Sequence, residues 1–126
     1  MPNPPLVVLI EDNAGDAHWF WMQLREGGVL CDVTTFNTGE AALQGLSEMP
    51  APDLIVADWR LPMLDGAQLI TELKRIPGLD RVPIVVLTGL GDLRRDAVQA
   101  GAVSCLTKPL NARNVETLVS FLHMKG

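Results

Sequence analysis

Polar side chains able to do chemistry follow four short hydrophobic runs of this 126-residue sequence. Glu11 and Asp12 follow residues 6–10, Asp58 follows 54–57, Thr88 follows 84–87, and Lys108 stands shortly after 103–106. Carboxylate oxygens are the hard ligands that Mg²⁺ prefers, and a carboxylate is also a nucleophile that can form an aspartyl-phosphate. If the fold gathers these residues, they predict phosphoryl chemistry at a divalent metal.

Charge explains why such a set needs a cation. Two carboxylates about 4 Å apart repel by about 1 kcal/mol in water and about 4 kcal/mol at an intermediate dielectric. A third carboxylate adds to this, so the group requires a proton, a lysine or a divalent ion. Mg²⁺ and Lys108 would neutralise phosphoryl oxygens during transfer, and Thr88 would donate a hydrogen bond to one of them.

Each residue taken alone has an ordinary explanation. Glu11 and Asp12 suit the start of a helix, Thr88 suits a turn or a cap, and Lys108 suits a solvated surface. Asp58 is harder to explain in this way, because it follows a buried run and precedes Trp-Arg-Leu-Pro, where no helix begins at once. The prediction of a site therefore depends on all of them meeting.

The elements that must position these residues are five hydrophobic runs alternating with five stretches of helical spacing. The runs are 6–10, 31–36, 54–57, 84–87 and 103–106, of which 31–36 mixes polar and apolar residues like an edge strand. Helical stripes that should face the core are Ala17, Phe20, Trp21 and Leu24, and Val115, Leu118, Val119 and Leu122. Thr38 and Asn111 are expected caps, and Gly27, Gly28 and Gly101 expected helix ends.

Alternating strands and helices predict an α/β domain with a parallel sheet and right-handed crossovers. Ligands of such sheets bind at the carboxyl ends of the strands, which is where all the residues above fall. The length of 126 residues fits one domain. The topology therefore predicts that residues distant in the sequence converge at one sheet edge.

Composition narrows the function classes. A net charge of −5 argues against direct nucleic acid binding, which relies on a basic surface. The longest apolar run, 6–10, is far too short to cross a membrane, and no signal peptide is evident. Cys31 and Cys105 lack any metal-binding spacing, so we expect reduced thiols in a cytoplasmic protein.

Four segments carry a family resemblance. Val-Val-Leu-Ile-Glu-Asp-Asn at 7–13, the segment 58–66 with its Asp-Trp-Arg-Leu-Pro start and Asp-Gly end, Val-Leu-Thr-Gly at 86–89 and Leu-Thr-Lys-Pro at 106–109 occur in order. Over about residues 5–124 the chain resembles the CheY-like receiver domains of two-component response regulators. The resemblance implies a (βα)5 flavodoxin-like fold with strand order 2-1-3-4-5, and one receiver domain over 1–126 without an output domain.

The resemblance also implies the chemistry. A sensor histidine kinase or histidine phosphotransfer protein would pass a phosphoryl group to Asp58. Glu11, Asp12, Asp58 and the backbone carbonyl of Arg60 would hold Mg²⁺ or Mn²⁺. Thr88, Gly89 and Lys108 would bind the phosphoryl group, and the Lys108–Pro109 bond would be cis. Such a domain is not an enzyme, because it catalyses only its own phosphorylation and dephosphorylation.

Signalling in the family implies two surfaces. Movement of Thr88 would reshape the surface of the fourth helix, fifth strand and fifth helix, which controls a downstream protein and in many members forms a homodimer. Cys105 stands where the family commonly has Tyr or Phe. The Arg60 side chain would lie beside the phosphoryl group, where it would screen that group or pair with Glu11. Trp19 is predicted to contact the kinase, or else only to lie over its neighbours.

Three other classes remain as alternatives. A phosphatase of the haloacid-dehalogenase kind would need a second acid at position 60, where this chain has Arg60. A degenerate receiver acting as a constitutive binding module is disfavoured by the full acidic, threonine and lysine set, although Cys105 favours it. A flavodoxin would need a hydroxyl-rich phosphate loop, whereas the loop after residue 10 is acidic.

Overall fold

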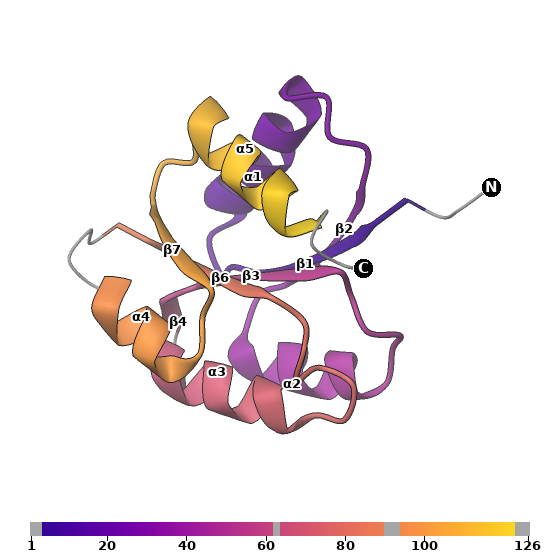
Figure 1. Ribbon diagram of the computed structural model, residues 1–126, viewed down its shortest axis with the longest axis vertical. Helices are drawn as coiled ribbons and strands as arrows, with labels where there is room; N and C mark the ends of the chain where they lie inside the picture. Colours follow the sequence, from indigo (N-terminus) through magenta and orange to yellow (C-terminus); the bar gives the residue numbers. More distant parts are fainter. Residues whose placement is uncertain (1–3, 62–63, 90–93, 123–126) are drawn as a thin grey trace.

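The computed structural model describes residues 4–61, 64–89 and 94–122, with the backbone alone at 60–61, 64–65 and 94. Within these ranges the strands are β1 (Leu6–Ile10), β2 (Asp32–Phe36), β3 (Leu54–Asp58), β4 (Arg60–Leu61), β5 (Leu64–Asp65), β6 (Ile84–Thr88) and β7 (Ser104–Thr107). The helices are α1 (Ala14–Glu26), α2 (Gly39–Ser47), α3 (Gly66–Arg75), α4 (Arg94–Ala100) and α5 (Ala112–Leu122). Helices α1 and α5 cover one face of the main sheet, and α2, α3 and α4 cover the other (Figure 1).

The main sheet of the described chain has five parallel strands in the order β2-β1-β3-β6-β7. This is the predicted order 2-1-3-4-5, since β4 and β5 form a separate two-stranded antiparallel hairpin. The chain crosses from one side of β1 to the other, so β1 and β3 are neighbours and Ile10 pairs with Ala57. Glu11 follows Ile10 and Asp58 follows Ala57, so these two carboxylates emerge at the same edge of the sheet.

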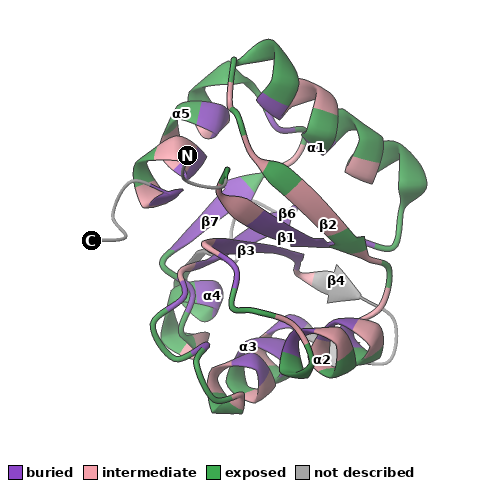
Figure 2. Ribbon diagram, turned by 90° about the vertical axis from the view of Figure 1, so that its right-hand side faces the viewer, coloured by how far each residue is buried: buried purple, intermediate pink, exposed green. Residues whose placement is uncertain are grey.

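Hydrophobic residues hold each helix layer on the sheet. One cluster, with Val8, Ile55, Ile70 and Val86, packs the sheet against α2, α3 and α4, and the other, with Leu9, Phe20, Val56 and Leu118, packs it against α1 and α5. In Figure 2 the central strands are buried, whereas β2 is partly exposed along the edge, as its mixed composition predicted. The acidic residues follow or end two of these buried central strands, β1 and β3.

Local signals set the helix ends where the sequence predicted them. The Ala41 N–H donates to Thr38 Oγ1 at 3.0 Å, and the Asn114 N–H donates to Asn111 Oδ1 at 2.9 Å. Helix α4 ends before Gly101, whose φ of 120° is a conformation that favours glycine. These caps satisfy backbone groups that have no partner within the helix.

Two features differ from the predictions. Trp21 was expected in the core, but it is 43% exposed and lies beside His18 and Arg25 on the surface of α1. The buried stripe of this helix is narrower than expected, with Phe20 and Leu24 as its fully buried members. The hairpin β4–β5 was not predicted, because strands of two residues leave no hydrophobic period to recognise.

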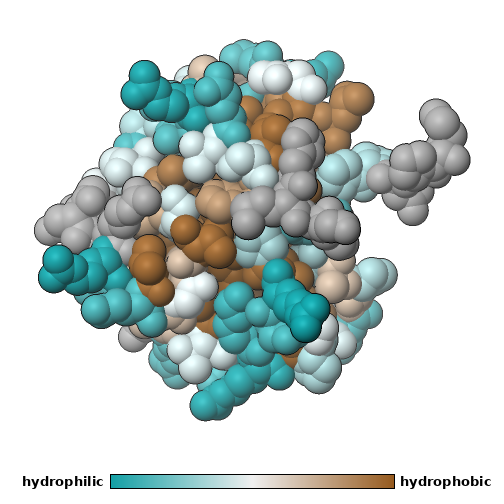
Figure 3. Space-filling view, in the orientation of Figure 1, coloured by the Kyte–Doolittle hydropathy of each residue, from teal (hydrophilic) through white to brown (hydrophobic). Residues whose placement is uncertain are grey.

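The opposite edge of the sheet carries an apolar hollow. It has a volume of about 650 Å³, and Val82, Pro83, Val103 and Phe121 line part of it. Figure 3 shows hydrophobic side chains gathered between the two helix layers. Among the helices of the described ranges, none combines the length and hydrophobicity that crossing a bilayer requires.

Candidate functional site

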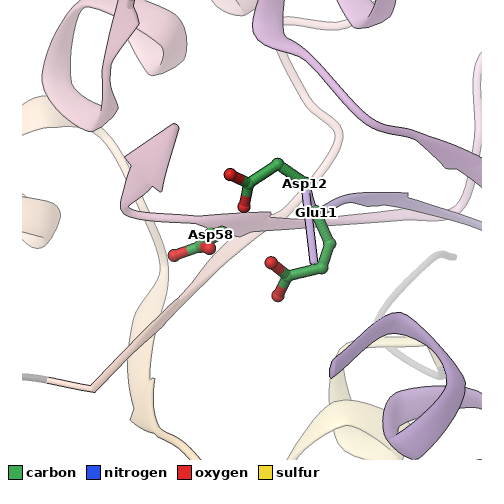
Figure 4. Close-up of side chains that lie close together, drawn as sticks. All are labelled: Glu11, Asp12 and Asp58. Carbon is green, nitrogen blue, oxygen red and sulfur yellow. The ribbon is translucent and has the colours of Figure 1, made fainter. Parts of the chain in front are cut away.

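Three carboxylates meet at the carboxyl edge of the sheet. Glu11 and Asp12 follow β1 and Asp58 ends β3, and oxygens of the three lie within 4.8 Å of one another (Figure 4). Glu11 and Asp58 are buried, whereas Asp12 is exposed. A cluster of hard oxygen ligands that is open on one side fits Mg²⁺, which keeps several waters when proteins bind it. The predicted convergence of these acids is therefore present.

Lys108 reaches the same point from β7. Its Nζ lies 2.7 Å from Glu11 Oε1 and 3.2 Å from Asp58 Oδ2. The backbone places it there, since the Lys108 N–H donates to the Thr88 carbonyl at 2.7 Å and so continues the β6–β7 pairing. The ammonium partly balances the buried acids, as the sequence predicted.

A fourth carboxylate, which the sequence analysis missed, also pairs with this lysine. Lys108 Nζ donates to Asp16 Oδ2 at 2.9 Å. Asp16 lies in the first turn of α1, where its backbone N–H donates to the capping oxygen of Asn13 at 2.8 Å. The available signal was an acid one helical turn beyond Asp12, on the helix that begins at the acidic loop.

Burial and neighbouring charge alter two pKa values. Burial raises the pKa of Glu11 from 4.5 to about 7; the hydrogen bond from Lys108 opposes this, and Asp58 adds to it. Burial alone would lower the pKa of Lys108, but hydrogen bonds to Glu11 and Asp16 and the charge of Asp58 raise it above its ordinary value. The lysine therefore stays charged, whereas burial favours the uncharged form of the Glu11 carboxyl group.

Thr88 ends β6, the strand next to that of Asp58. Leu87 pairs with Asp58, so Thr88 lies one residue beyond the acid along the sheet edge. Thr88 is fully buried, and Gly89 after it is exposed. The hydroxyl residue and the acid thus come from adjacent strands, as predicted.

The segment after Asp58 is anchored by its backbone. The Trp59 N–H donates to the Leu87 carbonyl at 2.9 Å, and a Cβ on Gly66 would lie 2.4 Å from the Trp59 ring, so only glycine allows this contact. The Arg60 backbone belongs to β4. Its side chain, like Pro62 and Met63 of the predicted motif, lies outside the described residues, and its carbonyl as a metal ligand stays a prediction.

The remaining predicted residues lie around Lys108. The Lys108–Pro109 bond is cis, as expected. Cys105 is buried in the same hydrophobic cluster as Ala97 and Ala102. Trp19 is 44% exposed, and its Nε1–H donates to the Leu110 carbonyl at 2.8 Å, so it is bonded to the fold and open to solvent at once.

Comparison with known proteins gives the same picture. Residues 7–120 match the family model of the response regulator receiver domain. Response regulator Rcp1 of Synechocystis sp. is 34% identical over 93 residues, which are 68% of this chain and 63% of Rcp1, so the chain spans less than two thirds of that relative.

Two solved structures show metal in related folds. The receiver domain of sensor histidine kinase PA1611 from Pseudomonas aeruginosa, with magnesium coordinated in its active site cleft, superposes with a TM-score of 0.80 at 29% identity, covering 95% of this chain and 98% of that one. The Mn²⁺-bound form of Rcp1 gives a TM-score of 0.74 at 27% identity, covering 97% and 94%. With its parallel sheet, its edge of acids and lysine, and these matches, the chain belongs to the response regulator receiver domains, which accept phosphoryl groups in two-component signalling.

Proposed function

We propose that Asp58 is the phosphoacceptor of this receiver domain. The observation that carries the proposal is that Asp58 lies close to both the acidic pair, Glu11 and Asp12, and the ammonium of Lys108. Its carboxylate lies within 4.8 Å of the Glu11 and Asp12 oxygens and 3.2 Å from Lys108 Nζ. A nucleophilic carboxylate beside a metal-binding pair and an ammonium is the arrangement that phosphoryl transfer needs.

The metal would be Mg²⁺ or Mn²⁺, held by Glu11, Asp12, Asp58 and the backbone carbonyl of Arg60. When bound, it supplies positive charge to the phosphoryl oxygens during transfer. The burial of Glu11 and the exposure of Asp12 support a half-open site of this kind. The Mg²⁺-bound and Mn²⁺-bound relatives support the same choice of ion.

In the proposed reaction an oxygen of Asp58 attacks the phosphorus of a phosphohistidine. The new O–P bond forms as the N–P bond breaks, and its electron pair stays on the imidazole nitrogen. Lys108 and Thr88 would hold phosphoryl oxygens by hydrogen bonds, with Gly89 leaving the approach open. Catalysis is then electrostatic stabilisation and positioning, without a general acid.

Receiver domains are signalling modules, and we propose that this one transforms no substrate other than its own aspartyl-phosphate. A phosphatase that releases alcohols from phosphate esters needs an acid to protonate the leaving group. At the corresponding place, two residues after Asp58, the chain has Arg60.

The output surface would comprise α4, β7 and α5. Phosphorylation adds about −1.5 to −2 charges, and Thr88 would follow the new oxygens. Because position 105 is a buried cysteine, this switch would proceed without an aromatic side chain turning inward there. A downstream protein is the proposed target of this surface, and a homodimer through it stays a prediction.

The phosphoryl donor would be a sensor histidine kinase or a histidine phosphotransfer protein that docks beside α1. The half-exposed Trp19, near Lys108 and Pro109, supports α1 as part of that surface. A cytoplasmic location, and signalling without direct contact to nucleic acid or membrane, stay predictions from the sequence.

The phosphoacceptor is tested by mass spectrometry after incubation with acetyl phosphate and Mg²⁺. The wild type should gain one phosphoryl group, and Asp58→Asn should gain none, because its amide is not a nucleophile. Chelation with EDTA should abolish the gain in the wild type. Asp80→Asn, an exposed aspartate before β6, is the matched control and should be labelled normally. Full labelling of a folded Asp58→Asn would refute the assignment.

A further inference from the structure

Asp16 holds the active-site lysine from outside the metal cluster. In the described structure the Lys108 ammonium contacts three carboxylates, at 2.7 Å for Glu11, 2.9 Å for Asp16 and 3.2 Å for Asp58. Glu11 and Asp58 belong to the acidic cluster, whereas Asp16 projects from α1. The two shortest contacts therefore attract the ammonium in different directions: Glu11 toward the acidic cluster and Asp16 toward α1.

The position of Asp16 is set by its own helix. Asn13 caps α1 by accepting the Asp16 N–H at 2.8 Å, which places this carboxylate in the first turn. One turn further along, Trp19 donates to the Leu110 carbonyl at 2.8 Å. Side chains from two successive turns of α1 therefore contact the Lys108–Leu110 segment, along a groove of about 550 Å³ that they line together.

Three donors on the ammonium meet three carboxylate acceptors. An –NH₃⁺ group has no further N–H to offer, so a phosphoryl oxygen must take the place of one existing acceptor. Glu11 and Asp58 have a second role as metal ligands in the proposed function. Asp16 has none, and it lies on the solvent side with a side chain 48% exposed. Its contact with Lys108 can therefore give way to a phosphoryl oxygen without disturbing a metal ligand.

We propose that Asp16 is a positioning residue that restrains Lys108 in the unphosphorylated protein and competes with the phosphoryl group for it. The proposal rests on the proposed function of Asp58 and deepens it. Arrival of the phosphoryl group draws the ammonium away from α1, so the Asp16–Lys108 contact weakens as the phosphoryl contact forms. Because a contact present only before binding opposes binding, removing the Asp16 charge strengthens phosphoryl binding.

The test is the affinity for beryllium fluoride, a mimic of the phosphoryl group, titrated at saturating Mg²⁺ so that metal affinity does not enter. Asp16→Asn should bind it about three-fold more tightly, in keeping with the small energies of exposed ion pairs. Asp16→Glu keeps the charge and should bind like the wild type. Glu26→Gln removes an equal charge at the far end of α1 and should change nothing.

A gain in affinity is informative because damage to the fold does not produce it. Unchanged or weaker binding in Asp16→Asn would overturn the proposal. If instead the wild type binds no beryllium fluoride and takes no phosphoryl group, the proposed function fails first. The two failures are therefore distinguishable.

A second measurement needs no metal. In EDTA, urea unfolding of Asp16→Asn, Lys108→Met and the double variant gives the coupling free energy between the two residues. A stabilising coupling supports the contact in the unphosphorylated state, and additive effects would overturn it. Both single variants must unfold cooperatively for this cycle, and the beryllium fluoride titration does not depend on Lys108→Met.

Discussion

At the scale of single residues, the site depends on how one buried acid carries its charge. Glu11 is 3% exposed, shares Lys108 with Asp58, and accepts the Asn13 N–H at 3.3 Å. Burial favours the protonated form of its carboxyl group, whereas the lysine and a bound cation favour the charged form. The metal-free protein thus holds Glu11 near the balance between the two forms at neutral pH.

This balance predicts a pH dependence of stability in EDTA. The pKa of Glu11 in the folded protein, about 7, lies above its ordinary value of 4.5. The protonated carboxyl group therefore stabilises the folded state fully below pH 4.5, and this contribution is lost as the pH rises through 7. Across that window the free energy of unfolding of the wild type should fall relative to Glu11→Gln, by up to about 3 kcal/mol. Urea denaturation at several pH values measures the difference. Parallel pH profiles for the two proteins would contradict the prediction.

At the scale of elements, the order of the strands in the sheet brings the site residues together. Placing β1 beside β3 and β3 beside β6 turns residues 11, 58 and 88 into neighbours, although they are far apart in the sequence. The β6–β7 pairing then adds Lys108. On the face toward α4, Cys105 belongs to the buried cluster that also contains Ala97 of α4, Ala102 and Val86 of β6, so a small side chain stands at this position of a packed layer.

This packing predicts that an aromatic residue is not tolerated at position 105. Cys105→Tyr should lower the free energy of unfolding by about 1–3 kcal/mol, because the larger side chain overfills a packed core. Thr107→Tyr, an exposed position two residues further along β7, is the control and should have little effect. Chemical denaturation measures both. Unchanged stability of Cys105→Tyr would mean that a pocket for the aromatic ring exists after all.

At the scale of the whole molecule, the proposed donor and the proposed target meet different surfaces. The acidic edge adjoins α1, which carries Trp19 next to the Lys108–Leu110 segment. The proposed output surface lies across α4, β7 and α5, on the side of the sheet away from β2 (Figure 1). In the proposed function, a phosphoryl group on Asp58 would act on the second surface after the first partner leaves.

The donor surface is tested by comparing two phosphoryl sources. Trp19→Ala should take a phosphoryl group from acetyl phosphate as the wild type does. Its transfer from a phosphohistidine protein should be slower by about ten-fold, because exposed aromatics often dominate an interface. Trp21→Ala removes the other half-exposed tryptophan of α1, which lies near β2, and serves as the control. Equal rates of transfer from the phosphohistidine protein for both variants would mean that Trp19 has only a structural role.

Much of this protein follows from short-range signals in the sequence. The first strand begins and ends where its hydrophobic run does, and Thr38 and Asn111 cap the helices they were expected to cap. The alternation of strands and helices predicted a parallel sheet, and a parallel sheet places Glu11, Asp58 and Lys108 at one edge. These features were predictable because neighbouring residues and a restricted set of connections determine them.

Only the tertiary structure decided the contacts that depend on how the helices pack against the sheet. Asp16 and Lys108 are 92 residues apart in the sequence, and they pair only because α1 packs with its first turn close to the end of β7. Trp21 has helical spacing suited to burial, but the width of the covered face of α1 leaves it exposed. The sequence determines which elements form and where their ends converge, whereas packing determines which side chains at those ends touch, since that depends on distances of a few ångströms between separate elements.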